Sequence, residues 1–334
     1  MDISLIKDAV KKRYGLEAKS IEKIKNVYKI KSDKTYCLKV IKYNLGHFLF
    51  IKGAILHLIR NGFYETPEII KTLDDDDYIS LQNSYAYLTL WINARECNYS
   101  NPLDVDIAVK KLAKLHNYSD NFQVEKDMNP RVGWFKWIET YRTRKDEVLS
   151  FKNIILSKNK KTEFDNMYLK IMDDEIERAD MSIEDLCSTD YLCEMKREIV
   201  RKGFCHHDYA HHNILISDDG KVSIIDFDYC ILDSYLHDLS SILIRVMKYG
   251  KWDISTASRI LENYNSVNKI SRKAIPIMAS FMEFPQEYWQ TGIQYYKERQ
   301  PWGEEFFVTK LKKIINDRDE RQDFADEFKY FKFN

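Results

Sequence analysis

Residues 204–229 read FCHHDYAHHNILISDDGKVSIIDFDY, and this stretch decides the fold. Two short apolar runs, 213–216 and 221–225, have the length and composition of β-strands. The SDDG segment between them (217–220) is a strong turn signal, because glycine adopts a positive φ without steric cost. The stretch therefore predicts a β-hairpin.

Oxygen-bearing side chains converge at one end of this predicted hairpin. Asn213 enters the first strand, Asp226 leaves the second, and Asp208 lies five residues before Asn213, with Asp228 as a further candidate. Magnesium prefers carboxylate and amide oxygens. Phosphoryl transfer requires that metal and a carboxylate that orients and deprotonates the attacking hydroxyl. We therefore predict Asp208 as the catalytic base, and Asn213, Asp226 and Asp228 as metal ligands.

The remainder of the chain divides into a β-rich part and a helical part. An amphipathic helix over residues 1–15 precedes predicted strands at 18–23, 27–30, 36–41, 78–82 and 85–90, with one helix at 45–60. After residue 103 the pattern is mainly helical, over 105–116, 134–150, 164–177, 189–202 and again from 237. This order predicts an α+β fold with two lobes, an antiparallel sheet with one packed helix followed by a mainly helical lobe.

Composition excludes several classes of protein. Lys+Arg and Asp+Glu both number 52, so the chain lacks the excess positive charge of a typical nucleic-acid binder. No stretch approaches the roughly 20 apolar residues that span a bilayer. The N-terminal residues lack the features of a signal peptide, and the six cysteines form no CxxC pair. We expect a cytoplasmic protein with reduced thiols.

The motif His206-x-Asp208-x4-Asn213, with Asp226 thirteen positions later, resembles the catalytic and metal-binding loops of the protein-kinase-like superfamily. His207 in place of the protein kinases' arginine, and DFD (226–228) in place of DFG, are closer to the aminoglycoside phosphotransferase and choline kinase branch. The segments HHDYAHHNILI (206–216), WINARE (91–96) and FPQEYW (284–289) resemble CotS-type spore-coat proteins of endospore-forming bacteria. This resemblance covers nearly the whole chain.

The resemblance implies ATP and Mg²⁺ as cofactors, a nucleotide-binding lobe at residues 1–90, a hinge at 91–93 and a helical lobe at 94–334. Lys39 matches the strand lysine that holds the α/β-phosphates, and Asp238 matches the buried aspartate that braces the catalytic loop through backbone amides. We expect His206 to support the same loop by hydrogen-bonding its backbone. The hinge backbone, which would bind adenine, includes Leu90, Trp91 and Ile92.

The resemblance implies a phosphotransferase that moves the ATP γ-phosphate to a hydroxyl of a small molecule. Spore-coat proteins are expected partners, and the mother-cell cytoplasm or the spore coat is the expected location. Nucleic acid and a membrane span are not expected. The sequence does not specify the acceptor.

Two departures from the superfamily pattern keep alternatives open. The predicted hairpin at 21–30 has no glycine for a phosphate-covering loop, and no Asp or Glu lies between Lys39 and Glu65 to pair with the lysine. These gaps favour a catalytically weak or inactive structural coat protein as the alternative. Four histidines between 206 and 212 leave a metal-dependent phosphohydrolase as a remote alternative. The aromatic run 284–296 and Trp252 are interpreted as helix packing more readily than as substrate contacts.

Overall fold

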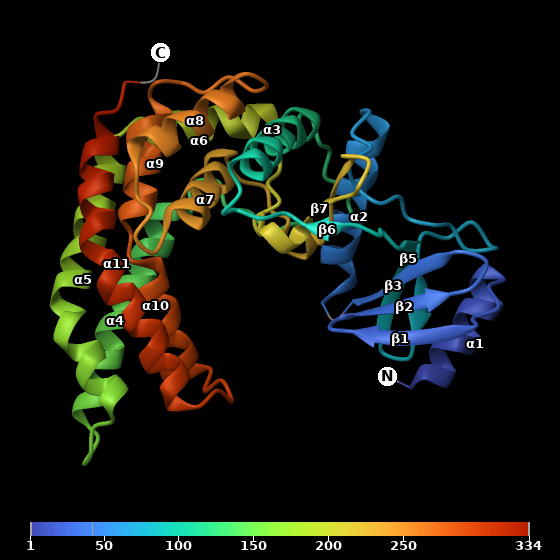
Figure 1. The fold of residues 1–334 in the computed structure, drawn as a ribbon, viewed down its shortest axis with the longest axis horizontal. Helices are drawn as coiled ribbons and strands as arrows, with labels where there is room; N and C mark the ends of the chain where they lie inside the picture. The colour runs from blue at the N-terminus through green and yellow to red at the C-terminus, as the bar shows by residue number, and fades with distance from the viewer. Residues whose placement is uncertain (1, 42, 333–334) are drawn as a thin grey trace.

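The computed structural model describes residues 2–41 and 43–332. Its N-terminal part is the five-stranded antiparallel sheet that the sequence predicted (Figure 1), and the structure gives the strand order β1-β2-β3-β5-β4. The strands are β1 (Ser20–Ile24), β2 (Val27–Lys31), β3 (Thr35–Ile41), β4 (Ile79–Leu81) and β5 (Ser84–Leu90).

Helix α1 (Ile3–Tyr14) packs on this sheet. Its buried residues Ile6 and Val10 share a core with Ile30, Leu38 and Leu88 of the strands. Burial alternates along β2 and β3, the period-two pattern of a sheet with one face against a core. Helix α2 (Leu45–Arg60) follows β3 with the bounds that the sequence predicted.

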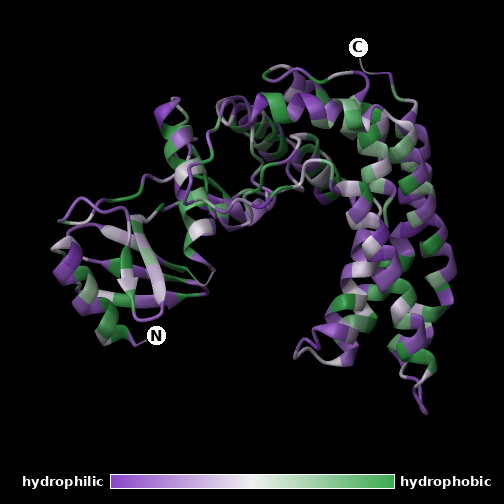
Figure 2. Cartoon of the chain, turned by 180° about the vertical axis from the view of Figure 1, so that it is seen from behind, coloured by the Kyte–Doolittle hydropathy of each residue, from purple (hydrophilic) through white to green (hydrophobic). Residues whose placement is uncertain are grey.

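The rest of the chain is mostly helical. Figure 1 shows an arch, with the blue sheet at one end and a bundle containing α4, α5, α10 and α11 at the other. In Figure 2, hydrophobic and hydrophilic residues alternate along the long helices, as expected when one face of each helix is buried. The helices are α3 (Pro102–Tyr118), α4 (Trp137–Leu156), α5 (Glu163–Ser188), α6 (Tyr191–Arg201), α7 (Leu236–Met247), α8 (Ile254–Asn265), α9 (Ala274–Glu283), α10 (Gln286–Gly292), the π-helix η3 (Ile293–Lys297) and α11 (Glu304–Lys329).

Helix α5 is longer than the sequence predicted. The expected end at residue 177 was wrong, since the helix continues to Ser188. Ala179, Ile183 and Leu186 are buried at the spacing of one helical face, so tertiary packing stabilises the additional turns.

The hairpin predicted over residues 213–225 is confirmed. Strand β7 (Ile214–Ile216) pairs antiparallel with β8 (Val222–Ile224), and Gly220 in the connecting turn has φ 78°. A third strand, β6 (Arg95–Glu96), pairs with β7. The sequence did not predict β6, because two residues carry no readable period. Single turns of 3₁₀ helix, η1 (His211–Asn213) and η2 (Phe227–Tyr229), flank the hairpin.

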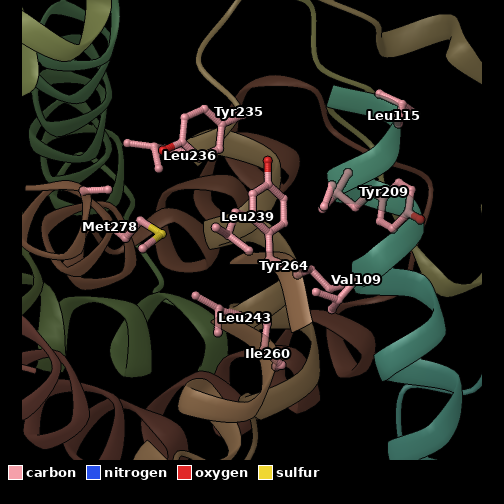
Figure 3. Packing of buried hydrophobic residues seen from close by; sticks show 14 of the residues in the cluster. Val109, Leu115, Tyr209, Tyr235, Leu236, Leu239, Leu243, Ile260, Tyr264 and Met278 are labelled. Atoms are coloured by element: carbon pink, nitrogen blue, oxygen red, sulfur yellow. The ribbon is translucent and has the colours of Figure 1, made fainter. Parts of the chain in front are cut away.

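A large hydrophobic core holds the residues before this hairpin in place. Figure 3 shows Tyr209 beside Val109 and Leu115 of α3, with Leu239 and Leu243 of α7 close by. Tyr209 is fully buried, and its hydroxyl donates to the backbone carbonyl of Ala108 at 2.8 Å. The loop that carries Asp208 is thus anchored in the core of the helical lobe.

No helix within the described ranges is both long enough and apolar enough to cross a lipid bilayer.

Candidate active site

Asp208 and Asn213 contact each other at the start of the hairpin. The Asn213 side-chain amide donates to the Asp208 backbone carbonyl at 2.9 Å and to the Asp208 carboxylate at 3.2 Å. The backbone N–H of Ile225 donates to the Asn213 carbonyl at 3.0 Å, which places Asp226 next to Asn213. Asn213 is buried, and its amide oxygen accepts no hydrogen bond from any described residue. That oxygen is therefore available as a metal ligand.

Lys39 reaches from β3 of the N-terminal sheet to the residues that follow the second strand of the hairpin. Its Nζ lies 2.6 Å from Asp226 Oδ1 and 2.7 Å from Asp228 Oδ1, and the Tyr43 hydroxyl donates to Asp228 at 2.8 Å. Burial opposes the charge on Lys39, but neighbouring Tyr87 and the two carboxylates raise its pKa above the usual value. Burial would raise the pKa of Asp226, but the Lys39 ammonium keeps it below the usual value. Lys39 and Asp226 therefore both carry full charges at neutral pH.

Asp226 also has an unusual backbone conformation. Its φ and ψ are 67° and 66°, in the left-handed region that residues other than glycine, asparagine and aspartate rarely adopt. Such a conformation costs on the order of 1 kcal/mol and persists only where the surroundings enforce it. Here it turns the chain sharply after β8 and directs the Asp226 carboxylate to Lys39.

Asp238, at the start of α7, braces the loop that precedes the hairpin. Its carboxylate accepts hydrogen bonds from the backbone N–H groups of His206 at 2.7 Å and His207 at 2.9 Å, and from His116 Nε2 at 3.2 Å. Burial alone would raise the pKa of Asp238, but the hydrogen bond from His116 and the nearby His237 ring, with Nδ1 3.7 Å from the carboxylate, keep it well below its usual value. Asp238 therefore remains ionised in the core.

His206 is fully buried beneath the same loop. Its Nε2 lies 2.9 Å from the backbone carbonyl of Ile225, on the strand leading to Asp226. Burial lowers the pKa of His206, so the ring is neutral at physiological pH. It joins the loop before the hairpin to the end of the hairpin.

Arg245 is a residue of the site that sequence reasoning missed. Its guanidinium lies 2.8 Å from Asp208 Oδ1. Arg245 follows Asp238 by seven residues, which is two turns along α7, so the two side chains share one face of the helix. This seven-residue spacing is the feature of the sequence from which Arg245 could have been predicted as a residue of the site.

The hinge residues lie at the end of β5. Leu90 pairs with Tyr36 of β3, and the Trp91 N–H donates to the Thr35 carbonyl at 2.9 Å. Lys29 Nζ lies 4.5 Å from the centre of the Trp91 ring. Ile92 follows Trp91 outside any strand. A role of this segment in adenine binding stays a prediction.

Both departures from the superfamily pattern in the N-terminal lobe are visible in the structure. The β1–β2 turn contains Lys25, with φ 52°, and no glycine. Helix α2 offers Lys39 no carboxylate; its nearest contribution is His47 Nε2, 3.1 Å from the Asp228 carbonyl. Asp226 and Asp228 take the place of an acidic partner from the helix.

The histidine-rich segment does not assemble a metal site. His211 and His212 are exposed, and the set with metal-like spacing in the described part of the chain is His116, Cys205 and Asp238. These groups are already hydrogen-bonded within the core: His116 Nδ1 to Tyr264 at 2.7 Å, and the Cys205 thiol to the Ser234 carbonyl at 3.1 Å. Burial raises the pKa of Cys205 well above its usual value, which disfavours the thiolate that a metal requires. The geometry gives no support to a metal-dependent phosphohydrolase.

The aromatic run 284–296 is mainly packing. Tyr288 and Tyr296 are buried against α4 and α5, and Tyr288 stacks on Tyr168 with ring centres 4.0 Å apart. Phe284 and Trp252 instead line a cavity beside Asp208.

An antiparallel sheet joined to a helical lobe, with this loop and hairpin between them, defines a two-lobed protein-kinase-like fold. The comparisons agree with this class. A family model described as "Spore coat putative kinase YutH" matches residues 7–328, so the chain belongs to that family. The resemblance to CotS-type coat proteins read from the sequence is thereby confirmed.

Solved structures share the fold over almost the full length. An aminoglycoside phosphotransferase from Alicyclobacillus acidocaldarius subsp. acidocaldarius DSM 446 is 19% identical, with a TM-score of 0.82 over 96% of this chain and 94% of that one. Spectinomycin phosphotransferase APH(9)-Ia, in complex with ADP and spectinomycin, is 17% identical, with a TM-score of 0.72 over 99% of both chains. Amicoumacin kinase hAmiN, in complex with AMP-PNP, Ca²⁺ and Ami, is 14% identical, with a TM-score of 0.65 over 100% of this chain and 96% of that one. At such identities the likeness establishes the fold.

Proposed function

We propose that this protein is an ATP-dependent phosphotransferase that moves the γ-phosphate to a hydroxyl group of a small molecule. One observation carries the proposal: Asp208, Asn213, Asp226 and Lys39, from two lobes, meet at one end of the β7–β8 hairpin. The structural neighbours crystallised with ADP or AMP-PNP support a nucleotide as the phosphate donor.

In this proposal Asp208 is the catalytic base. Arg245 and the Asn213 amide fix its carboxylate from two sides and leave lone pairs to accept a proton. The acceptor hydroxyl oxygen forms a bond to the γ-phosphorus while the bond from that phosphorus to the β,γ-bridging oxygen breaks. The hydroxyl proton moves to Asp208, and ADP leaves with the bridging oxygen.

The donor set fits Mg²⁺. The Asn213 amide oxygen and the carboxylates of Asp226 and Asp228 would hold the ion, since all are hard oxygen ligands. Bound Mg²⁺ would supply charge neutralisation to the nucleotide phosphates. Lys39, which already lies between the two carboxylates, would contact the α/β-phosphates.

The hinge completes the proposed nucleotide site. The backbone of Leu90, Trp91 and Ile92 would receive the adenine, between a nucleotide lobe at residues 1–90 and a helical lobe at 94–334. The hydrogen bond from the Trp91 N–H to the Thr35 carbonyl holds this segment beside β3.

Two substitutions test these roles. In Asp208→Asn, we expect ADP formation with an accepted substrate to fall by about 10²-fold or more, because the base is lost, while nucleotide binding remains. In Asp226→Ala, we expect nucleotide binding itself to lose its dependence on magnesium. Asp218→Asn, the same chemical change on the exposed hairpin turn, is the control. Equal turnover of Asp208→Asn and the unchanged protein would refute the base assignment.

A second candidate function is a structural spore-coat protein with weak chemistry. The glycine-free β1–β2 turn favours it, because backbone amides there cannot approach phosphates as closely as glycine permits. The family match supports association with the spore coat in either case. A fluorescent fusion carrying Asp208→Asn separates the two functions: normal coat assembly by this variant supports a structural role, and defective assembly ties the role to catalysis.

A further inference from the structure

A cavity beside Asp208 provides space for the acceptor. It encloses about 710 Å³, within the usual range for small-molecule sites. Its walls come from the loop of Asp208 and from α4, α7, α9, α10 and α11. Asp208 borders the cavity, whereas Lys39, Asn213 and Asp226 are not among its described lining residues. A molecule in the cavity would therefore present its hydroxyl to Asp208 from the side away from the Lys39 cluster.

The cavity wall carries more positive than negative charge. Its described lining includes four carboxylates, Asp208, Asp233, Glu287 and Asp317, against six basic side chains, and the His207 ring, which stacks on that of His237, adds no charge. Burial, followed by the effect of His237, lowers the pKa of His207 to about 2, so His207 is neutral at physiological pH. The basic lining residues are Arg131, Lys136, Arg144, Arg245, Lys248 and Arg321.

The carboxylates in the wall are already bound by donors of the protein. Asp317 accepts from the Trp252 indole at 2.9 Å and from the Gly250 N–H at 3.0 Å. Asp233 accepts from the Trp137 indole at 2.9 Å, and burial raises its pKa to about 6.

The remaining two carboxylates are paired with cations. Glu287 lies 2.7 Å from Lys248, and Asp208 pairs with Arg245. Two of the four carboxylates are therefore paired with cations and the other two have oxygens that already accept from neutral donors of the protein, which leaves few carboxylate lone pairs for a cationic acceptor.

Arg144 is a lining cation that has no carboxylate partner among the residues that the structure describes. Its guanidinium donates to the neutral Gln286 amide oxygen at 2.6 Å and lies 4.4 Å from the centre of the Trp289 ring. Glu147, three residues along α4, is bound instead by the Trp289 indole at 2.7 Å and by Lys297 at 3.1 Å. Burial lowers the pKa of Arg144, yet a guanidinium remains charged in proteins. The charge is therefore partly desolvated and uncompensated.

Arg131 is the second such cation. Within the described ranges it forms no ion pair, and its guanidinium lies 5.7 Å from the centre of the Tyr229 ring. It is exposed and lines the same cavity as Arg144. Two guanidinium groups that form no ion pair within the described ranges thus line one cavity, and a planar carboxylate or a phosphate is the ligand that such groups bind with paired hydrogen bonds.

We propose that the acceptor is a small hydroxylated oxyanion whose carboxylate or phosphate binds Arg131 and Arg144 while its hydroxyl faces Asp208. This inference rests on the proposed phosphotransferase function and names its substrate class. The stacked rings of Tyr141 and Phe284, 3.9 Å apart, form an apolar wall for the carbon skeleton. Cationic acceptors such as aminocyclitols or choline would meet like charge at the same wall.

Binding is tested without turnover by calorimetric titration of the full chain. The probes are glycerate and gluconate as carboxylates, glycerol 3-phosphate as a phosphate, glucitol as a neutral polyol, and choline and spectinomycin as cations. We expect the carboxylate probes or the phosphate probe to bind. The probe with the lower Kd shows whether the site prefers a carboxylate or a phosphate. Arg144→Gln and Arg131→Gln should each weaken that binding by about tenfold or more.

Two further variants control for structure. Arg142→Gln changes an exposed arginine of the same helix that does not line the cavity, and it should bind as the unchanged protein does. Arg144→Lys retains the charge and should restore part of the affinity lost in Arg144→Gln, which a purely structural role would not predict.

The outcomes separate this inference from the proposed function. Binding by choline, spectinomycin or glucitol but by no oxyanion overturns the inference, and phosphorylation of one of them leaves the phosphotransferase function intact. Arginine-dependent oxyanion binding by a protein that does not bind Mg-ATP supports the anion site and overturns the function. Oxyanion binding that is equal in Arg142→Gln and Arg144→Gln also overturns the inference.

Discussion

Replacement of Asp238 by asparagine tests how the loop of residues 206–208 is held. The carboxylate is fully buried and accepts from two backbone N–H groups, at 2.7 and 2.9 Å, and from His116. An asparagine keeps one neutral acceptor and places an NH₂ group against at least one of these donors. Each hydrogen bond to a charged group contributes about 1.5–3 kcal/mol, and a buried charged network broken at one member loses about 3–5 kcal/mol. We therefore expect Asp238→Asn to lower the free energy of unfolding by about 3–5 kcal/mol.

The assay is urea unfolding at pH 7, followed by far-UV circular dichroism, with Asp218→Asn as the matched control. The control changes an exposed aspartate in the hairpin turn and should shift the free energy of unfolding by less than about 0.5 kcal/mol. A loss below about 1 kcal/mol for Asp238→Asn would refute the bracing role.

The same variant has a defined pH dependence. The pKa of Asp238 is lower in the folded state than its unfolded value of about 3.9. Its stabilisation is therefore complete above that value and is lost as the pH falls through the folded pKa. The difference in stability between the unchanged protein and Asp238→Asn should be constant from pH 5 to 8, within about 0.5 kcal/mol, and should shrink below about pH 4. A difference that grows on acidification would contradict the assignment.

Three further predictions concern other parts of the molecule. Lys39→Met should raise the Kd for Mg-ATP by about tenfold or more, measured by calorimetry, because phosphates lose a charged donor; unchanged affinity would exclude that role. Burial raises the pKa of Glu198 to about 7, so its contribution to stability is present below about pH 4 and lost as the pH rises through 7. At pH 8, Glu198→Gln should therefore have a higher melting temperature than the unchanged protein, because its free energy of unfolding is higher by up to about 3 kcal/mol. Near pH 4 the two proteins should be equally stable. A variant that is less stable than the unchanged protein at pH 8 would contradict this. A Cβ at Gly292 would overlap neighbouring aromatic side chains, so Gly292→Ala should lower the melting temperature and reduce the free energy of unfolding by about 1–3 kcal/mol. Gly303 lies in open space, so Gly303→Ala should reduce the free energy of unfolding by less than about 1 kcal/mol. Equal reductions in the two variants would argue against overpacking at Gly292.

Local signals made the hairpin and the N-terminal sheet predictable. The SDDG turn, two apolar runs and alternating burial are properties of neighbouring residues, and the structure has β7, β8 and the five-stranded sheet where they point. The sequence also showed that no acidic residue on α2 could pair with Lys39. It could not show that Asp226 and Asp228 would do so, because the pair joins residues 187 positions apart.

Tertiary packing explains what the sequence did not reveal. Strand β6 exists because two residues happen to lie beside β7, and α5 extends to Ser188 because α9 and α11 cover its additional turns. The unpaired Arg131 and Arg144 are ordinary surface cations in a linear sequence. They become neighbours of one cavity only when the loop before α4 and the helix itself fold around the loop of Asp208.

Thermal unfolding with ATP, with and without Mg²⁺, tests the central claim most directly. A ligand at one hundred times its Kd stabilises the folded state by about 2.7 kcal/mol, which gives a measurable rise in melting temperature. The account predicts a rise with Mg-ATP in the unchanged protein and the loss of its magnesium dependence in Asp226→Ala. No rise at millimolar Mg-ATP, or an equal magnesium-dependent rise in Asp226→Ala, would contradict it.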